Sequence, residues 1–488
     1  MSVRDLRGPA FASKRNLGSV PAAGPWVRPS SWLALPDVTG LQKFAGLHAV
    51  YPDSNFVALS AEGNFTVDWG DGTGTTNVSS GVTAEYNIPY ANAATTSDVG
   101  IAGAVACTFT DSGDTVNLTA HGWINGQQVA FSTITSTTGI STYTTYFIVN
   151  KAADTFQVAT TAGGSALTLT TNGSGNVYVP QYRQVIVTVV PNGGNITKLN
   201  LHIKHSTSGL QKYSSGFLDV AISAANMTDL RFAVQTPGLL GQVITHSLLQ
   251  QFNLVASDLR QLGNLIYLCY SLRNIQNVVT SSAAAVSASC TFTDSTDTVG
   301  LTAHGFRDGD SVIFTTVTTT TGITKNTEYF ARDVATDTFK VTNTYGGTAM
   351  VLTTDGTGTA VRGTNFSNMF YNCSSLTSVP LFNTAAGMDF GNMFQYCYAL
   401  PSVPLLVTSG GSTVYTNMFS TCQSLKSAAL SGTANTISYV NCELSAAELN
   451  KIYTGLATAT KTITVTGNWG VASDDTSIAT GTNWTVTG

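Results

Sequence analysis

Few residues in this 488-residue sequence have the type and spacing needed for chemistry. Asp68 and Asp71 lie three residues apart in a predicted turn, where they could bind a cation or form the turn; aspartates at such positions more often form the turn. His202 and His205 form an H-x-x-H pattern, but in a strand this spacing places them on opposite faces. We therefore expect no metal site and no cofactor.

No catalytic constellation emerges from the motifs. The sequence contains no phosphate-binding loop, dinucleotide fingerprint or G-x-S-x-G motif. None of the seven cysteines forms a C-x-x-C pair, and we expect the four repeated ones to be buried small hydrophobic residues: Cys269, Cys373, Cys397 and Cys422. Two carboxylates facing across a cleft would suit glycoside hydrolysis, and the sequence does not exclude them. We expect a non-enzymatic protein with no catalytic residue.

His121 and His304 occur in two identical Thr-Ala-His-Gly motifs, each with an aromatic residue two positions later. Each surrounding segment contains one histidine, so the motif predicts a structural role beside a tight turn. The following aromatics, Trp123 and Phe306, have two alternative roles. They could stack on a glycan at the surface, or they could pack into a core.

These motifs belong to a duplicated segment. Residues 107–177 and 290–360 align without a gap, and 40 of the 71 positions are identical, which indicates duplication of one folding unit. Alternating apolar residues and turn dipeptides predict short strands. We expect two small all-β modules, module 1 over residues 105–179 and module 2 over residues 286–361.

A shorter repeat, Asn-Met-Phe-x-x-Cys-x-x-Leu, starts at residues 368, 392 and 417, and a weaker copy starts at Asn264. The period of 24–25 residues predicts a solenoid of stacked coils. The repeat resembles the BspA-like surface leucine-rich repeats. This resemblance implies a leucine-rich-repeat-like solenoid over 196–285 and 362–488, interrupted by module 2 and ending in a cap that begins at Ser445.

Residues 64–73, NFTVDWGDGT, resemble the immunoglobulin-like domain of polycystic-kidney-disease (PKD) type. The resemblance implies that Trp69 is a core residue and that the last strand follows Tyr182. The expected β-sandwich covers residues 36–104 and 180–195, and module 1 interrupts it. Insertions survive at exposed loops, so both modules should protrude from a mainly β protein.

Residues 1–35 read as an extended basic arm. The arm contains four prolines and five basic residues: Arg4, Arg7, Lys14, Arg15 and Arg28. We expect it to dock on a partner; the alternative is that it packs along its own sandwich.

Composition excludes several classes of function. The formal net charge is −5, charged residues make up 10% of the chain, and no Lys/Arg run exceeds two residues, which argues against nucleic-acid binding. No apolar stretch is long enough to span a membrane, and the N-terminus lacks the apolar segment of a secretory signal. We expect folding in a reducing cytoplasm.

The Thr-Ala-His-Gly modules resemble those of tailed-phage tail and fibre proteins, and PKD-like sandwiches also occur on phage particles. The resemblance implies a structural protein of the virion, assembled in the host cytoplasm. Our first expectation is a tail fibre or receptor-binding appendage, homo-oligomeric, with the arm on other virion proteins and with host glycan as a partner. The alternatives are a head decoration protein or head fibre, and a bacterial adhesin with leucine-rich repeats.

Overall fold

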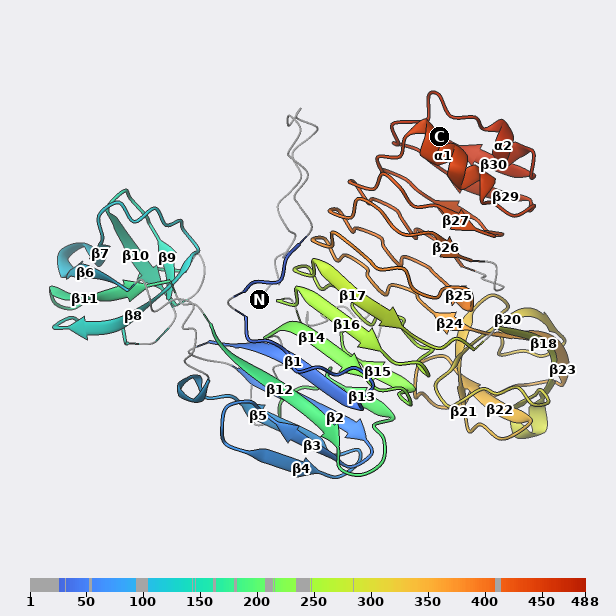
Figure 1. Cartoon of the computed structure of the whole chain (residues 1–488), viewed down its shortest axis with the longest axis horizontal. Helices are drawn as coiled ribbons and strands as arrows, with labels where there is room; N and C mark the ends of the chain where they lie inside the picture. Colours follow the sequence, from blue (N-terminus) through green and yellow to red (C-terminus); the bar gives the residue numbers. More distant parts are fainter. Residues whose placement is uncertain are drawn as a thin grey trace.

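The computed structural model describes residues 26–30, 32–51, 55–93, 104–142, 144, 146–160, 164–179, 182–206, 214, 216–233, 246, 248–283, 285–408 and 414–488. The fold is mainly β (Figure 1). It combines a seven-stranded sheet, a four-stranded sheet, two closed six-stranded barrels and a stack of coils with short parallel strands.

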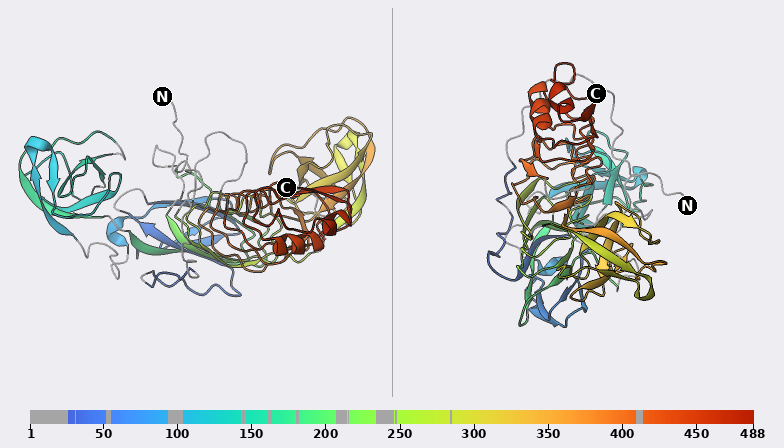
Figure 2. Two further views of the ribbon diagram at one scale, coloured as in Figure 1. Left: turned by 90° about the horizontal axis from the view of Figure 1, so that it is seen from above. Right: turned by 90° about the vertical axis from the view of Figure 1, so that its right-hand side faces the viewer.

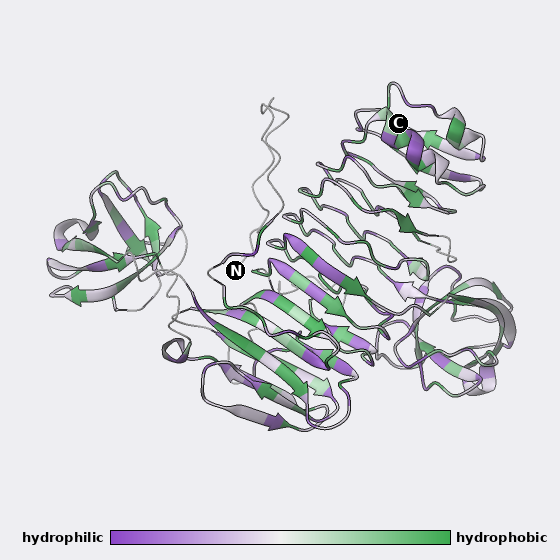
Figure 3. Cartoon of the chain, in the orientation of Figure 1, coloured by the Kyte–Doolittle hydropathy of each residue, from purple (hydrophilic) through white to green (hydrophobic). Residues whose placement is uncertain are grey.

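The two open sheets share one core. The larger sheet has the order β17-β16-β14-β1-β12-β3-β4 and the smaller has the order β15-β13-β2-β5. Along β12 (Arg183–Pro191), Val185, Val187 and Val189 are buried, and most of the strand is hydrophobic (Figure 3). The remaining strands are β1 (Lys43–Val50), β2 (Phe56–Glu62), β3 (Phe65–Asp68), β4 (Thr75–Val78), β5 (Thr83–Asn87), β13 (Lys198–Asn200), β14 (Phe217–Ser223), β15 (Asp229–Arg231), β16 (Gln251–Val255) and β17 (Asn274–Val279).

The larger sheet changes from antiparallel to parallel pairing at β14. β1 pairs antiparallel with both β12 and β14, whereas β14, β16 and β17 pair parallel. The boundary expected at residue 195 therefore falls within a continuous sheet. One hydrophobic cluster extends from Phe44 to Trp484 and includes Trp69, so the expected sandwich and the repeats share a core.

The repeats stack in register. Asn264, Asn368, Asn392 and Asn417 all adopt left-handed backbone conformations, with φ between 53° and 61°, which asparagine tolerates better than most residues. The rings of Phe370, Phe394 and Phe419 form a buried column, with centroid separations of 5.3 and 5.6 Å. The short strands of these coils are β24 (Thr364–Asn365), β25 (Gly387–Asp389), β26 (Leu406–Val407) and β27 (Leu430–Ser431).

The repeated cysteines are fully buried, as predicted, and they also link the coils. The thiol of Cys397 donates to the carbonyl of Phe370 at 3.1 Å, and that of Cys422 donates to the carbonyl of Phe394 at 3.0 Å. Burial raises the pKa of both thiols well above the usual range. These thiols are therefore structural groups and not nucleophiles.

A helical cap ends the stack. The side chain of Ser445 accepts a hydrogen bond from the Glu448 backbone N–H, which starts α1 (Ala446–Thr454) as the capping motif predicts. β28 (Ile437–Ser438), β29 (Lys461–Thr464) and β30 (Trp484–Thr487) form a parallel sheet, and α2 (Ser477–Thr480) precedes β30. None of the helices in the described part of the chain has the length and apolar character that crossing a membrane requires.

The duplicated segments fold as closed barrels with the same strand connectivity. Barrel 1 consists of β6 (Val105–Thr110), β7 (Thr115–Asn117), β8 (Gln128–Thr135), β9 (Tyr146–Val149), β10 (Thr155–Ala159) and β11 (Gly173–Tyr178). Barrel 2 consists of β18 (Val286–Thr293), β19 (Thr298–Gly300), β20 (Ser311–Thr318), β21 (Glu328–Arg332), β22 (Thr338–Thr342) and β23 (Gly356–Arg362). Each barrel has its own hydrophobic cluster.

The two barrels have different surroundings. Barrel 1 stands apart from the rest of the molecule, whereas barrel 2 lies against the repeats (Figures 1 and 2). Arg260 forms a 2.8 Å ion pair with Asp310 of barrel 2, and Met388 of the repeats packs against Ile313 and Val361. Only barrel 1 therefore protrudes as expected, because side chains of the repeats hold barrel 2 in place.

This difference predicts different outcomes for two excisions. Replacing 105–179 with a short Gly-Ser linker should leave the melting temperature of the remaining body within about 3 °C of its original value. Replacing 286–361 should lower it by about 5 °C or more, because Met388 becomes exposed and Arg260 loses its partner. Thermal unfolding followed by circular dichroism measures both. Equal losses from the two excisions would contradict the difference.

Candidate functional site

Of the expected basic arm over residues 1–35, the structure describes residues 26–30 and 32–35. Arg4, Arg7, Lys14 and Arg15 lie outside the described residues. Arg28 forms a 2.7 Å ion pair with the buried Asp219, and its guanidinium lies 5.4 Å from the centre of the Trp32 ring. Trp32 packs with Leu47, Ala49 and Leu218. The part of the arm around Arg28 therefore packs on the protein's own sheet, which was the alternative to docking on a partner.

The two candidate glycan-stacking residues differ in exposure. Phe306 is only 5% exposed; its ring lies 4.6 Å from that of Phe339, and the Arg362 guanidinium lies 5.7 Å from its centre. A ring buried in this way has no free face for a sugar, so Phe306 is a core residue of barrel 2. Trp123 is half-buried and lies 5.5 Å from Phe156, so part of its surface remains accessible.

The repeated Thr-Ala-His-Gly motif around each histidine forms a turn. Nδ1 of His121 accepts a hydrogen bond from the backbone N–H of Trp123, and Nδ1 of His304 accepts one from the backbone N–H of Phe306, at 3.1 and 2.9 Å. Asp71 similarly accepts hydrogen bonds from the Thr73 backbone and from the Tyr86 hydroxyl. These side chains therefore stabilise local turns.

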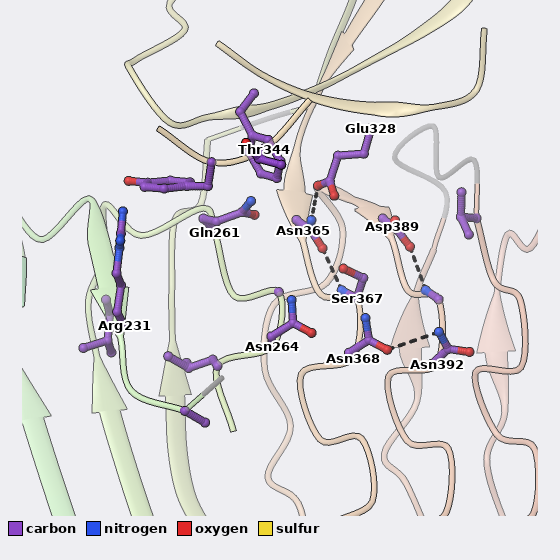
Figure 4. A pocket seen from close by; sticks show the side chains of 18 of the residues that line it. Arg231, Gln261, Asn264, Glu328, Thr344, Asn365, Ser367, Asn368, Asp389 and Asn392 are labelled. Atoms are coloured by element: carbon purple, nitrogen blue, oxygen red, sulfur yellow. Dashed lines mark hydrogen bonds between the residues drawn. The ribbon is translucent and has the colours of Figure 1, made fainter. Parts of the chain in front are cut away.

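A candidate site lies in a cleft between barrel 2 and the repeats, where polar side chains from three parts of the chain meet (Figure 4). The cleft has a volume of about 440 Å³, within the usual range for small-molecule sites. Barrel 2 contributes one side, the repeats contribute the floor, and β15 contributes the remaining wall. The principal polar lining residues are Arg231, Gln261, Asn264, Glu328, Thr344, Asn365, Ser367, Asn368, Asp389 and Asn392.

Two carboxyl groups face this cleft from different elements. Glu328 of β21 accepts hydrogen bonds from Asn365 Nδ2 and Ser311 Oγ, and Asp389 of β25 accepts one from the Gly391 backbone at 2.7 Å. Burial, together with the nearby charge of Asp389, raises the pKa of Glu328 to about 7. Burial likewise raises the pKa of Asp389 to about 6. Near neutral pH the pair therefore holds at most about one proton, so it carries negative charge and can still donate one hydrogen bond.

Arg231 and Tyr345 form one wall of the cleft. The Arg231 guanidinium lies 4.4 Å from the centre of the Tyr345 ring, and its Nε lies 3.1 Å from Oδ2 of Asp229. Tyr345 also contacts Phe330, with ring centroids 5.8 Å apart. The positive charge of Arg231 is thus balanced locally and stabilised by an aromatic face.

This arrangement suits binding by hydrogen bonds and ring contacts. The sequence pattern identified the repeated asparagines, but it did not predict that they would line a cleft, because β15, barrel 2 and the coils that form it are far apart in the chain. Comparison with protein-family models, with curated proteins and with solved structures finds no match to this chain.

Proposed function

We propose that the chain is a non-enzymatic structural protein of a tailed-phage virion, a tail fibre or receptor-binding appendage that contacts glycans on the host surface. The observation that carries the binding role is the cleft, in which amides, carboxyl groups and aromatic rings converge. The assignment to a virion rests on the resemblance of the duplicated modules to those of phage tail proteins, which is an argument by analogy.

We also infer the finer fold from the same resemblances. The two sheets around Trp69 are a PKD-like sandwich, and the coils that repeat every 24–25 residues are a leucine-rich-repeat-like solenoid. Support for the solenoid comes from parallel bridges between successive coils, such as that between Ser402 and Ser427. Support for the sandwich comes from β12, which pairs with β3 across the insertion of barrel 1.

Immunogold electron microscopy of intact phage particles tests the assignment, with an antibody raised against residues 36–488. Gold at the tail supports an adsorption appendage. Gold over the head would replace this proposal with a head decoration protein. Label on cell envelopes without label on particles would favour the adhesin. Release of shorter sugars from a bound oligosaccharide would overturn the non-enzymatic part of the proposal.

Attachment to the particle should depend on residues 1–25, since Arg28 and Trp32 contact the protein's own sheet. Deleting residues 1–25 should leave a folded protein whose incorporation into particles falls at least tenfold. Quantitative immunoblotting of purified particles measures incorporation, and circular dichroism verifies folding. Normal incorporation of the folded deletion variant would contradict the docking role of the arm.

A further inference from the structure

A row of asparagine side chains forms the floor of the cleft (Figure 4). Asn264, Asn368 and Asn392 occupy the same position in three stacked coils, although the first two are far apart in sequence. Backbone hydrogen bonds hold the coils together, from Asn264 N–H to the Ser367 carbonyl and from Asn368 N–H to the Gly391 carbonyl. Coils paired in this way place their side chains at the strand spacing of ~4.8 Å.

These amides have unused hydrogen-bonding groups. Asn392 Nδ2 donates to Asn368 Oδ1 at 3.1 Å. Among the described residues, Asn368 Nδ2, Asn392 Oδ1 and the side-chain amide of Asn264 have no protein partner. The cleft thus presents both free donors and free acceptors, which hydroxyl groups match because each both donates and accepts.

The charges in the cleft disfavour an anionic ligand. Its titratable groups are Asp229, Arg231, Glu328, Tyr345 and Asp389. The one guanidinium among them is paired with Asp229, while Glu328 and Asp389 add negative charge as they ionise. An acidic sugar would face like charges, whereas a neutral hydroxyl could accept from or donate to either carboxyl group.

Two aromatic side chains also line the cleft. Phe330 and Tyr345 line the side of the cleft contributed by barrel 2. The Arg231 guanidinium covers one face of Tyr345, so the apolar C–H face of a pyranose ring would pack on the surface of these half-buried rings that stays exposed, while the polar edge of the sugar reaches the amides.

We propose that this cleft binds a neutral oligosaccharide, with successive sugar rings lying along Asn264, Asn368 and Asn392. The proposal rests on the proposed function in that it names the chemical class of glycan such an appendage would contact. Its carboxyl groups select against sialic and uronic acids, and its amide row selects for an extended chain of hydroxyl-bearing rings.

The test measures binding of the purified full-length chain to immobilised tetrasaccharides of glucose, galactose, mannose and N-acetylglucosamine, with polygalacturonate and polysialic acid as the acidic probes. Asn368→Gly and Asn392→Gly remove one amide each while keeping a residue that tolerates positive φ. Asn417→Gly is the matched control, because Asn417 has a φ of 54° in the next coil but does not line the cleft.

We expect the wild type to bind at least one neutral tetrasaccharide and neither acidic polymer. Each cleft variant should weaken binding at least tenfold, and the control should bind like the wild type. Absence of binding to every neutral probe, preference for an acidic probe, or equal effects of all three variants would overturn the proposal. These outcomes are distinguishable from those of particle labelling: gold at the tail without saccharide binding would overturn the cleft proposal and leave the virion assignment standing.

Discussion

Replacing Phe394 with alanine is expected to lower the free energy of unfolding by about 3–5 kcal/mol. The Phe394 side chain is fully buried, and its ring lies between those of Phe370 and Phe419, with interplanar angles of 14° and 3°. Truncation would leave a cavity that the neighbouring coils cannot fill, because hydrogen bonds hold their backbones at a fixed spacing. Urea unfolding followed by circular dichroism measures the loss.

Leu381→Ala is the matched control for this substitution. Leu381 is a large apolar residue of the same repeats, but it is 73% exposed. Its truncation should change the free energy of unfolding by less than about 0.5 kcal/mol. A loss below about 1 kcal/mol for Phe394→Ala, or equal losses for the two variants, would contradict the role of the phenylalanine column.

Glu328→Gln is expected to stabilise the protein at pH 8 and to have little effect at pH 4. Burial raises the pKa of Glu328 from 4.5 to about 7 in the folded protein. A carboxyl group with a raised folded pKa contributes stability that is fully present below its unfolded pKa and is lost as pH rises through the folded pKa. The wild type therefore loses on the order of 3 kcal/mol of folding free energy as Glu328 ionises, whereas the variant, with a neutral glutamine, does not.

Comparing the free energy of unfolding of the wild type and of Glu328→Gln at each pH isolates the contribution of Glu328. Burial lowers the pKa of His48 to about 4 and that of His246 to about 3, so the histidines contribute stability above pH 6.5 that is lost in acid. This loss affects the wild type and the variant equally. Glu443→Gln, at a carboxyl group outside the cleft, is the control. Parallel stability curves for Glu328→Gln and wild type between pH 4 and 8 would refute the prediction.

Local patterns predicted the interior of the repeats well. Cys373, Cys397 and Cys422 were predicted to be buried from their period, and all three are fully buried. A period is informative here because each coil buries the same positions against its neighbours. The turn role of His121 was predictable for a related reason, since its bond to the Trp123 backbone spans only two residues.

Features that depend on long-range contacts were not predictable. Nothing in the sequence near Arg231 indicates that Tyr345 will cover it, because that contact exists only once barrel 2 docks on the repeats. The continuous sheet across residue 195 depends on β1 pairing with β14, and both strands are too uniformly buried to specify a partner. The sequence did indicate that the arm packs on the protein. Trp26 and Trp32 are large apolar side chains, which an arm surrounded by solvent would expose to water.

The ends of each barrel lie beside one another in its ladder. Val105 pairs with Val177 in barrel 1, and Val286 pairs with Arg362 in barrel 2. A unit with adjacent ends can enter a host loop without separating the strands on either side, which explains how one barrel occupies two unrelated positions in the same chain. Barrel 2 also contacts the repeats, whereas barrel 1 stands apart, so the position of barrel 1 is the one that could accept an unrelated domain. Recombination, or a protein engineer, could exchange the unit at residues 105–179 for another domain with adjacent termini and so change what the molecule displays while its body stays the same.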